Sequence, residues 1–195
     1  MKEFNTTGIC VPSMHYMVDV GEKIAEIKKL IDKGSYFTIN RGRQYGKTTM
    51  LYEIRRHLSD EYLVIKISFE GLGDESFSSA KEFCATLLKL ISRSLLGLSV
   101  SAEKGYAEKW LNKGVVNFDS LCEHITVLTQ NKKIILMIDE VDRTSNNQVF
   151  LHFLSMLRKK FLAARAGDDT TFHSVILAGV HDIKNIKSRI GQFTA

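Results

Sequence analysis

The stretch that decides the fold is residues 40–51, which read NRGRQYGKTTML. Residues 46–48, Gly-Lys-Thr, end it in the way that the phosphate-binding pattern G-x-x-x-x-G-K-[ST] ends. Counting back through that pattern puts Arg41 in the place of the first glycine, and Gly42 comes one position later. We expect Gly42 to supply the backbone freedom that a turn out of a strand requires. The segment therefore predicts a phosphate-binding loop with an altered first position.

The patterns on both sides of this loop have the order that such a loop needs. Tyr36–Asn40 is rich in β-branched and aromatic residues, which predicts a strand leading into the loop. After the loop, Leu51, Ile54 and Leu58 recur at helical spacing, which predicts a helix over Lys47–Leu58. A Gly-Lys-Thr triplet between a strand and a helix is a much stronger signal than the triplet alone.

The chemistry of a phosphate-binding loop rests mostly on its backbone, because successive N–H groups and the positive end of the following helix surround a phosphate. Gly46 lies where a Cβ would hinder this wrapping, Lys47 would supply a cation to the β- and γ-phosphates, and Thr48 would supply a hydroxyl ligand to Mg²⁺. We expect the Lys47 side chain to be exposed when no nucleotide is bound. The predicted nucleotide-binding residues are Arg41, Gly42, Arg43, Gln44, Tyr45, Gly46, Lys47, Thr48 and Thr49.

Two carboxylates follow the most apolar strand pattern of the chain. The run from Ile134 to Ile138 is continuously apolar and leads directly into Asp139 and Glu140. Ligand chemistry in a parallel α/β sheet gathers at the carboxyl ends of the strands, so this pair should face the loop. We expect Asp139 to hold Mg²⁺ through its water shell and Glu140 to activate the attacking water. Glu140 and Lys47 are the predicted catalytic residues. Surface acids at an ordinary strand-end turn are the alternative, which the Gly-Lys-Thr triplet on an earlier strand disfavours.

The rest of the chain alternates strand patterns with longer helical patterns. Such alternation indicates an α/β fold with a parallel sheet, flanked by helices and joined by right-handed crossovers. Ser79 and Glu82 have capping-box spacing at the start of the longest of these helices. Further strands are predicted over residues 62–69, 133–138 and 173–179, and further helices over residues 19–33, 102–111 and 147–164, from residue 79 onward and from residue 118 onward.

Composition places the chain among ordinary globular proteins. It has 195 residues, of which 44% are apolar and 25% charged, enough for one domain with a real core. The net charge of +5 permits an anionic ligand, but no basic stripe interleaved with aromatic residues indicates nucleic acid. The basic triplet at residues 158–160 is expected on a solvated helix face.

Cysteine usage and the N-terminal sequence bear on location. Cys10, Cys84 and Cys122 show neither metal-ligand spacing nor a close pair, which fits a reducing compartment. Residues 1–16 contain no apolar run of signal-peptide length, and the run from Ile134 to Ile138 is far too short to cross a bilayer. We therefore expect a cytoplasmic protein that does not engage a membrane.

Several motifs together resemble those of the bacterial AAA-ATPase-like family, over nearly the whole chain. They are YMVD at residues 16–19, NRGRQYGKTTML at 40–51, IDEVDR at 138–143, NNQVFLHFLSMLRKKF at 146–161 and FHSVILAGVHDIKN at 172–185. The resemblance implies a P-loop ATPase of the additional-strand class, with Walker A and Walker B motifs and with ATP and Mg²⁺ as cofactors. It also implies the strand order 36–40, 173–179, 133–138 and 62–69. We expect residues 1–34 to pack on a core over residues 35–195.

Longer members of the family continue past this point, often into a nuclease-like C-terminal domain. This chain stops where a fifth core strand would begin, so we expect a core that is incomplete at its C-terminus and an uncovered edge on Tyr36–Asn40. The N-terminal stretch around Gly8 to Val11, a second copy of the chain, or nothing could cover that edge. We favour self-association to a homo-oligomer or poor solubility.

Other polar residues lie near the expected site with a weaker argument for each. A polar sensor role competes with helix capping at His181 and Asp182, and a charge-stabilising role competes with an ordinary helix surface at Arg143 and Arg158. Glu70 could approach the site from the end of its strand. Near the adenine, the resemblance suggests Tyr16, Val18 and Asp19, for which a structural role in starting the first helix is the alternative.

Two functions are consistent with these residues. The first is Mg²⁺-dependent ATP hydrolysis, which Glu140 favours because a pure binder needs Asp139 but no base. The second is a nucleotide-gated binding switch with little or no turnover, which the early end of the chain favours. The adenine base is implied by the resemblance, since the residues themselves do not separate ATP from GTP.

Overall fold

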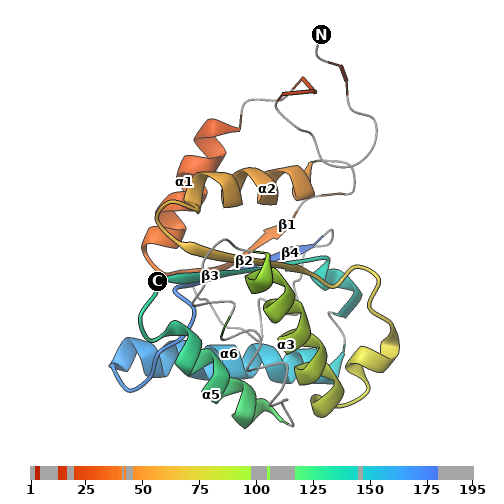
Figure 1. Cartoon of the computed structure of the whole chain (residues 1–195), viewed down its shortest axis with the longest axis vertical. Helices are drawn as coiled ribbons and strands as arrows, with labels where there is room; N and C mark the ends of the chain where they lie inside the picture. The colour runs from red at the N-terminus through yellow and green to blue at the C-terminus, as the bar shows by residue number, and fades with distance from the viewer. Residues whose placement is uncertain are drawn as a thin grey trace.

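The computed structural model describes residues 3–4, 13–16, 20–40, 42, 46–97, 105, 117–144 and 147–179. Its centre is a four-stranded parallel sheet in the order β1-β4-β3-β2 (Figure 1). The strands are β1 (Tyr36–Asn40), β2 (Leu63–Ser68), β3 (Ile134–Asp139) and β4 (Ser174–Gly179). Fold class and strand order are those predicted. Most of the strand ends differ from their predicted positions by one residue.

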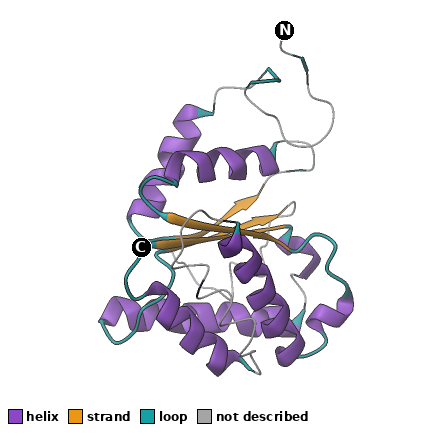
Figure 2. Cartoon of the chain, viewed as in Figure 1, coloured by secondary structure: helices purple, strands orange, loops and turns teal. Residues whose placement is uncertain are grey.

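The sheet is sandwiched between two layers of helices (Figure 2). One face is covered by α1 (Gly21–Asp32) and α2 (Lys47–Leu58), and the other by α3 (Ala80–Leu96), α5 (Phe118–Thr129) and α6 (Gln148–Ala166), as Figure 1 shows. Each face has its own apolar cluster, because alternate residues of every strand point to opposite layers. Every residue of β3 and β4 is buried, which explains why their sequences are apolar apart from Asp139 at the end of β3 and Ser174 at the start of β4. Short 3-10 turns η1 (Asp74–Phe77) and η2 (Val141–Thr144) complete the connections.

Side chains fix where the larger helices begin. The Ser79 hydroxyl accepts a hydrogen bond from the Glu82 N–H, as the predicted capping spacing requires. Asn117 forms a capping box with Ser120 at the start of α5, and Asn147 accepts from two N–H groups at the start of α6. The first helix differs from its prediction, because α1 begins after Val20 rather than after Asp19 and has no side-chain cap.

Among the described strands, β1 pairs on one side only, with β4. Four of its five residues remain partly exposed, whereas β4 is buried throughout. The predicted edge is therefore present within the described residues. The stretch around Gly8 to Val11, the predicted helix at 102–111 apart from Gly105, and everything after Gly179 lie outside them. In the part of the chain that is described, no helix has the length and apolar character needed to cross a bilayer.

Candidate functional site

The predicted loop lysine and the predicted acidic pair meet at the carboxyl end of the sheet. The Lys47 ammonium lies 2.5 Å from Glu140 Oε1 and 3.2 Å from Asp139 Oδ1. The Thr48 hydroxyl lies 3.5 Å from Asp139 Oδ2. Lys47 and Thr48 are the first two residues of α2, and Asp139 ends β3. The parallel sheet thus brings together two pairs of neighbouring side chains, and the two pairs are more than 90 positions apart in sequence.

Gly46 gives the chain the conformation that lets α2 start at the site. It is the N-cap residue of α2, with φ 71° and ψ 25° in the left-handed region that favours glycine. A Cβ built on it would meet no atom of the described residues within 4 Å. Among these residues, backbone conformation rather than crowding therefore selects glycine here.

Asp139 is held firmly at the end of β3. It is 4% exposed, and its Oδ1 accepts a hydrogen bond of 2.9 Å from the Glu140 N–H as well as facing Lys47. Its other oxygen faces Thr48. This buried carboxylate is oriented from the backbone and from α2, which is the arrangement expected of a group that fixes a cation.

Glu140 has an unusual backbone. Its φ of 59° makes it the non-glycine residue with positive φ among those described. A left-handed conformation costs a residue with a Cβ about 1–2 kcal/mol. Strain of this kind persists where the surroundings over-determine it, and it clusters at functional sites. In this conformation the Glu140 carboxylate lies at the start of α2, where it forms an ion pair with Lys47.

The expectation that Lys47 is exposed without nucleotide is wrong. Its side chain is 7% exposed. Burial alone lowers the pKa of the Lys47 ammonium, but the hydrogen bond to Glu140 and the charge of Asp139 outweigh burial and raise that pKa. The sequence pattern missed this because it shows the loop and the acids separately and not the pairing between them.

The remaining predicted site residues fall into two groups. Gly42 and Thr49 are described and partly buried beside the loop, whereas Arg41, Arg43, Gln44 and Tyr45 lie outside the described residues. Glu70 comes two residues after Ser68, the last residue of β2, and is exposed. Arg158 is exposed on α6, in the layer opposite to α2.

The weaker candidates are mostly untested. His181, Asp182, Val18 and Asp19 lie outside the described residues. Tyr16 is 54% exposed and its ring contacts Phe4.

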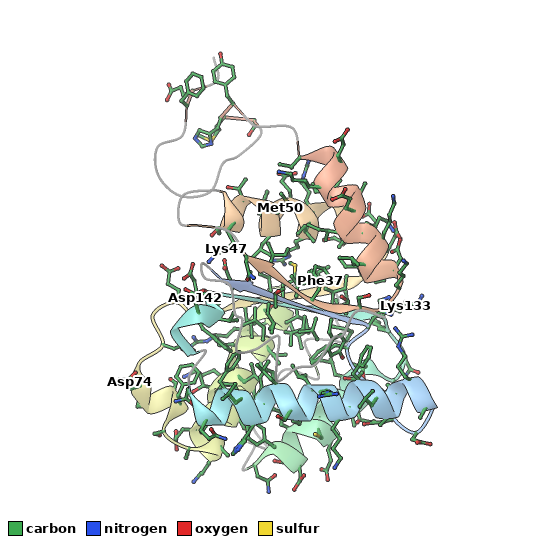
Figure 3. The ribbon with its side chains drawn as sticks, turned by 180° about the vertical axis from the view of Figure 1, so that it is seen from behind. Phe37, Lys47, Met50, Asp74, Lys133 and Asp142 are labelled. Atoms are coloured by element: carbon green, nitrogen blue, oxygen red, sulfur yellow. The ribbon has the colours of Figure 1, made fainter. Side chains whose placement is uncertain are left out.

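One acidic residue near the site was not singled out from the sequence. The carboxylate of Asp142, in η2, lies over the end of β4 so closely that a Cβ on Gly179 would be 2.5 Å from its Oδ1. Figure 3 shows Asp142 and Lys47 at the same end of the sheet. The signal was available in the sequence, because a 3-10 turn after Asp139 brings a residue three positions later back to the sheet.

The donor set fits a magnesium–phosphate group. Mg²⁺ is usually held by one or two carboxylates together with phosphate oxygens and retained water, and Asp139 with Thr48 supplies the protein part of such a set. Within the described ranges no three His, Cys, Asp or Glu side chains form a metal centre of their own. The open turn at Gly46 and the cation of Lys47 complete the chemistry that a phosphate requires.

Comparison with known proteins decides the family. A family model described as "AAA-like domain" matches residues 8–183. The chain belongs to this AAA-like domain family. Membership indicates a nucleotide-binding domain of the P-loop ATPase type, as the sequence resemblance predicted. No curated protein matches the chain.

Solved structures similar to this AAA-like domain include assemblies from Drosophila. A chain of Drosophila ORC bound to AT-rich DNA and Cdc6 has 13% sequence identity and a TM-score of 0.44, with 88% of this chain and 48% of that chain covered. A chain of Drosophila ORC bound to DNA has 14% identity and a TM-score of 0.44, with 88% and 80% covered. This chain thus spans about half the length of the first of these structures.

Proposed function

We propose that this AAA-like domain binds ATP with Mg²⁺ and hydrolyses it. The observation that carries the proposal is the convergence of Lys47, Thr48, Asp139 and Glu140 at one end of the sheet. The family and the loop support nucleotide binding, and the proposal of hydrolysis rests on Glu140, a carboxylate that a binding site alone does not need.

Each residue has a separate role in this proposal. Lys47 and the backbone of residues 41–49 bind the β- and γ-phosphates, and Thr48 and Asp139 hold Mg²⁺. Bound Mg²⁺ would neutralise charge that develops on the phosphate oxygens. Glu140 orients the attacking water and accepts its proton. The predicted assignments of Arg41, Arg43, Gln44 and Tyr45 to the same loop are part of this proposal.

Hydrolysis requires Lys47 and Glu140 to separate. In the structure the Lys47 ammonium and the Glu140 carboxylate form an ion pair at 2.5 Å, so neither group is free for a reaction. A bound anion competes with Glu140 for Lys47 and leaves the Glu140 carboxylate available as a base. Strain at the Glu140 backbone favours this release, because the residue needs a partner to hold it in the left-handed region.

The same contact supports a second candidate, a nucleotide-gated switch with little or no turnover. If the ion pair between Lys47 and Glu140 persists when nucleotide is bound, the domain binds ATP and changes conformation, but Glu140 does not activate water. The two candidates therefore share one site and differ only in whether Glu140 is released.

The test is the affinity and turnover of the unmodified chain. Calorimetric titration with ATP, and with GTP in parallel, in the presence of Mg²⁺ should show binding with a preference for ATP. Steady phosphate release that depends on Mg²⁺ supports hydrolysis, whereas binding without release supports the switch. Absence of binding to either nucleotide contradicts both candidates.

We also propose a cytoplasmic location and self-association. Cys84 and Cys122 are free thiols, which suits a reducing compartment. Self-association is proposed because, among the described strands, β1 is at the edge of the sheet, where a second copy of the chain could add a strand. Light scattering over a range of protein concentrations tests this, and a concentration-independent monomer mass would exclude it.

A further inference from the structure

The charges described at the site do not suit an anionic ligand. Lys47 supplies one positive charge, while Asp139 and Glu140 supply two negative charges within hydrogen-bonding distance of it. A nucleotide triphosphate approaching these described side chains would meet a net negative charge. Some further cation near Asp139 would reduce this repulsion.

Lys66 lies on the same face of the sheet as Asp139. Neighbouring Val64 packs into the apolar cluster under α2, and alternate residues share a face, so the side chain of Lys66 also points toward α2. Met137 is its partner in the register of β2 and β3, and Asp139 comes two residues after Met137. Their Cα atoms are therefore about 8 Å apart, from a strand spacing of about 4.8 Å and a rise of about 3.3 Å per residue.

The Lys66 ammonium has no ion-pair partner in the described part of the chain, although it is partly buried. Burial lowers its pKa, the negative charge of Asp139 opposes that effect, and the positive charge of Arg55 on α2 adds to it. Burial outweighs the charge of Asp139, so the charged form of Lys66 costs the fold some stability. A methionine would fill the same space without this cost, so folding alone does not account for a lysine at this position.

We propose that Lys66 is a further cation of the nucleotide site, which attracts the phosphates through its charge from the outer side of Asp139. This inference rests on the proposed function. Lys47 forms ion pairs with two carboxylates, whereas Lys66 forms no ion pair with any of the described residues. It acts without touching the ligand, by offsetting the negative potential of Asp139 and Glu140.

The experiment compares three variants in calorimetric titrations of ATP and of uncharged adenosine, with EDTA and with Mg²⁺. Lys66→Met should weaken the binding of ATP in EDTA by about tenfold and leave adenosine unchanged. Excess Mg²⁺ or about 1 M salt should reduce the loss, because both screen the charge of the ligand or of the site. Lys66→Arg keeps the charge and should keep the affinity.

The matched control is Lys133→Met, which removes one exposed positive charge at the opposite end of β3. Figure 3 shows Lys133 and Lys47 at opposite ends of the sheet. Its ATP affinity should equal that of the unmodified chain. Unfolding measurements should show Lys66→Met to be at least as stable as the unmodified chain, which excludes a folding defect as the cause.

Three outcomes overturn the role of Lys66. These are an unchanged ATP affinity in Lys66→Met, an equal loss for ATP and adenosine, and an equal loss in Lys66→Arg. Failure of the proposed function is distinguishable from all three, because the unmodified chain would then bind no ATP.

Discussion

Two buried lysines lie at opposite ends of the sheet, and each is paired with carboxylate. Lys160, on α6, is 3% exposed, and its ammonium lies 2.5 Å from Asp169 and 2.7 Å from the Thr126 hydroxyl. Asp169 also accepts hydrogen bonds from the Thr126 hydroxyl and from the Thr170 N–H. This Lys160 cluster precedes β4 and so lies at the amino end of the sheet, whereas the Lys47 cluster lies at the carboxyl end.

The two clusters differ in charge balance and in strain. In the Lys160 cluster one cation meets one carboxylate, and both carboxylate oxygens have partners with ordinary geometry. In the Lys47 cluster one cation meets two carboxylates, and Glu140 is held in a left-handed conformation. Burial and ion pairing are common to both, so they do not by themselves mark a functional site. The unbalanced charge and the strained backbone are what separate a site prepared for a ligand from a structural clamp.

The largest expected effect is on the structural cluster. Lys160→Met should lower the free energy of unfolding by about 2–3 kcal/mol, because it leaves the partly buried Asp169 carboxylate without its cation. Its affinity for ATP should not change. Urea denaturation and nucleotide titration of the same preparation measure both quantities. A stability loss below about 0.5 kcal/mol would show that the Lys160 cluster does not stabilise the fold.

A second effect separates binding from turnover within the Lys47 cluster. Glu140→Gln should retain or tighten ATP binding, because the neutral amide competes less for Lys47, and should lower phosphate release by at least about tenfold. Single-turnover and calorimetric measurements provide the two values. Equal losses of affinity and turnover would instead assign Glu140 to a structural or metal-binding role.

Two glycines offer a matched pair for the two ends of the sheet. Gly46 and Gly167 both have positive φ, 71° and 88°, and a Cβ on either would meet no atom within 4 Å in the described part of the chain. Substitution by alanine should therefore cost each variant about 1 kcal/mol of stability, from backbone strain alone. Only Gly46→Ala should also weaken ATP binding. Equal ATP affinities in the two variants would remove Gly46 from the phosphate-binding turn.

The smallest expected effect is a dependence of the stability of the Lys160 cluster on pH. Burial raises the pKa of Asp169, but its hydrogen bonds to Lys160, Thr126 and Thr170 outweigh burial and lower that pKa below the usual value of about 3.9. A carboxyl group with a lowered folded-state pKa stabilises the fold above the unfolded value and loses that contribution as pH falls through the folded value. The stability difference between the unmodified chain and Lys160→Met should therefore shrink from pH 5 downward. A constant difference across this range would contradict the ion pair.

Local patterns were sufficient to predict the sheet. Strands β3 and β4 are buried at every position, and their long apolar runs, Ile134–Ile138 and Val175–Gly179, make them unambiguous. The start of α2 at Lys47 follows from the glycine before it and from the helical spacing after it. The strand order was implied by the family resemblance and is confirmed.

Pairings between distant residues could not be predicted in the same way. The expectation of a solvated face holds for Arg158 and Lys159 but is wrong for Lys160. Position 160 lies three residues after Leu157 and seven after Phe153, both buried, so helical spacing places it on the inner face of α6. Its partner Asp169 comes from the loop after the helix, a contact that periodicity does not reveal. The pairing of Lys47 with Glu140 was missed for the same reason.

The most direct test of the central claim is a titration of MgATP into three proteins: the unmodified chain, Lys47→Ala and Lys160→Met. The account predicts that Lys47→Ala binds MgATP at least about tenfold more weakly, a loss on the order of 1.4 kcal/mol or more, while folded Lys160→Met binds it as tightly as the unmodified chain. Both variants lose a buried lysine, so a shared effect of instability would appear in both. Unchanged affinity in Lys47→Ala, or an equal loss in the two variants, would contradict the assignment of the nucleotide site to the carboxyl end of the sheet.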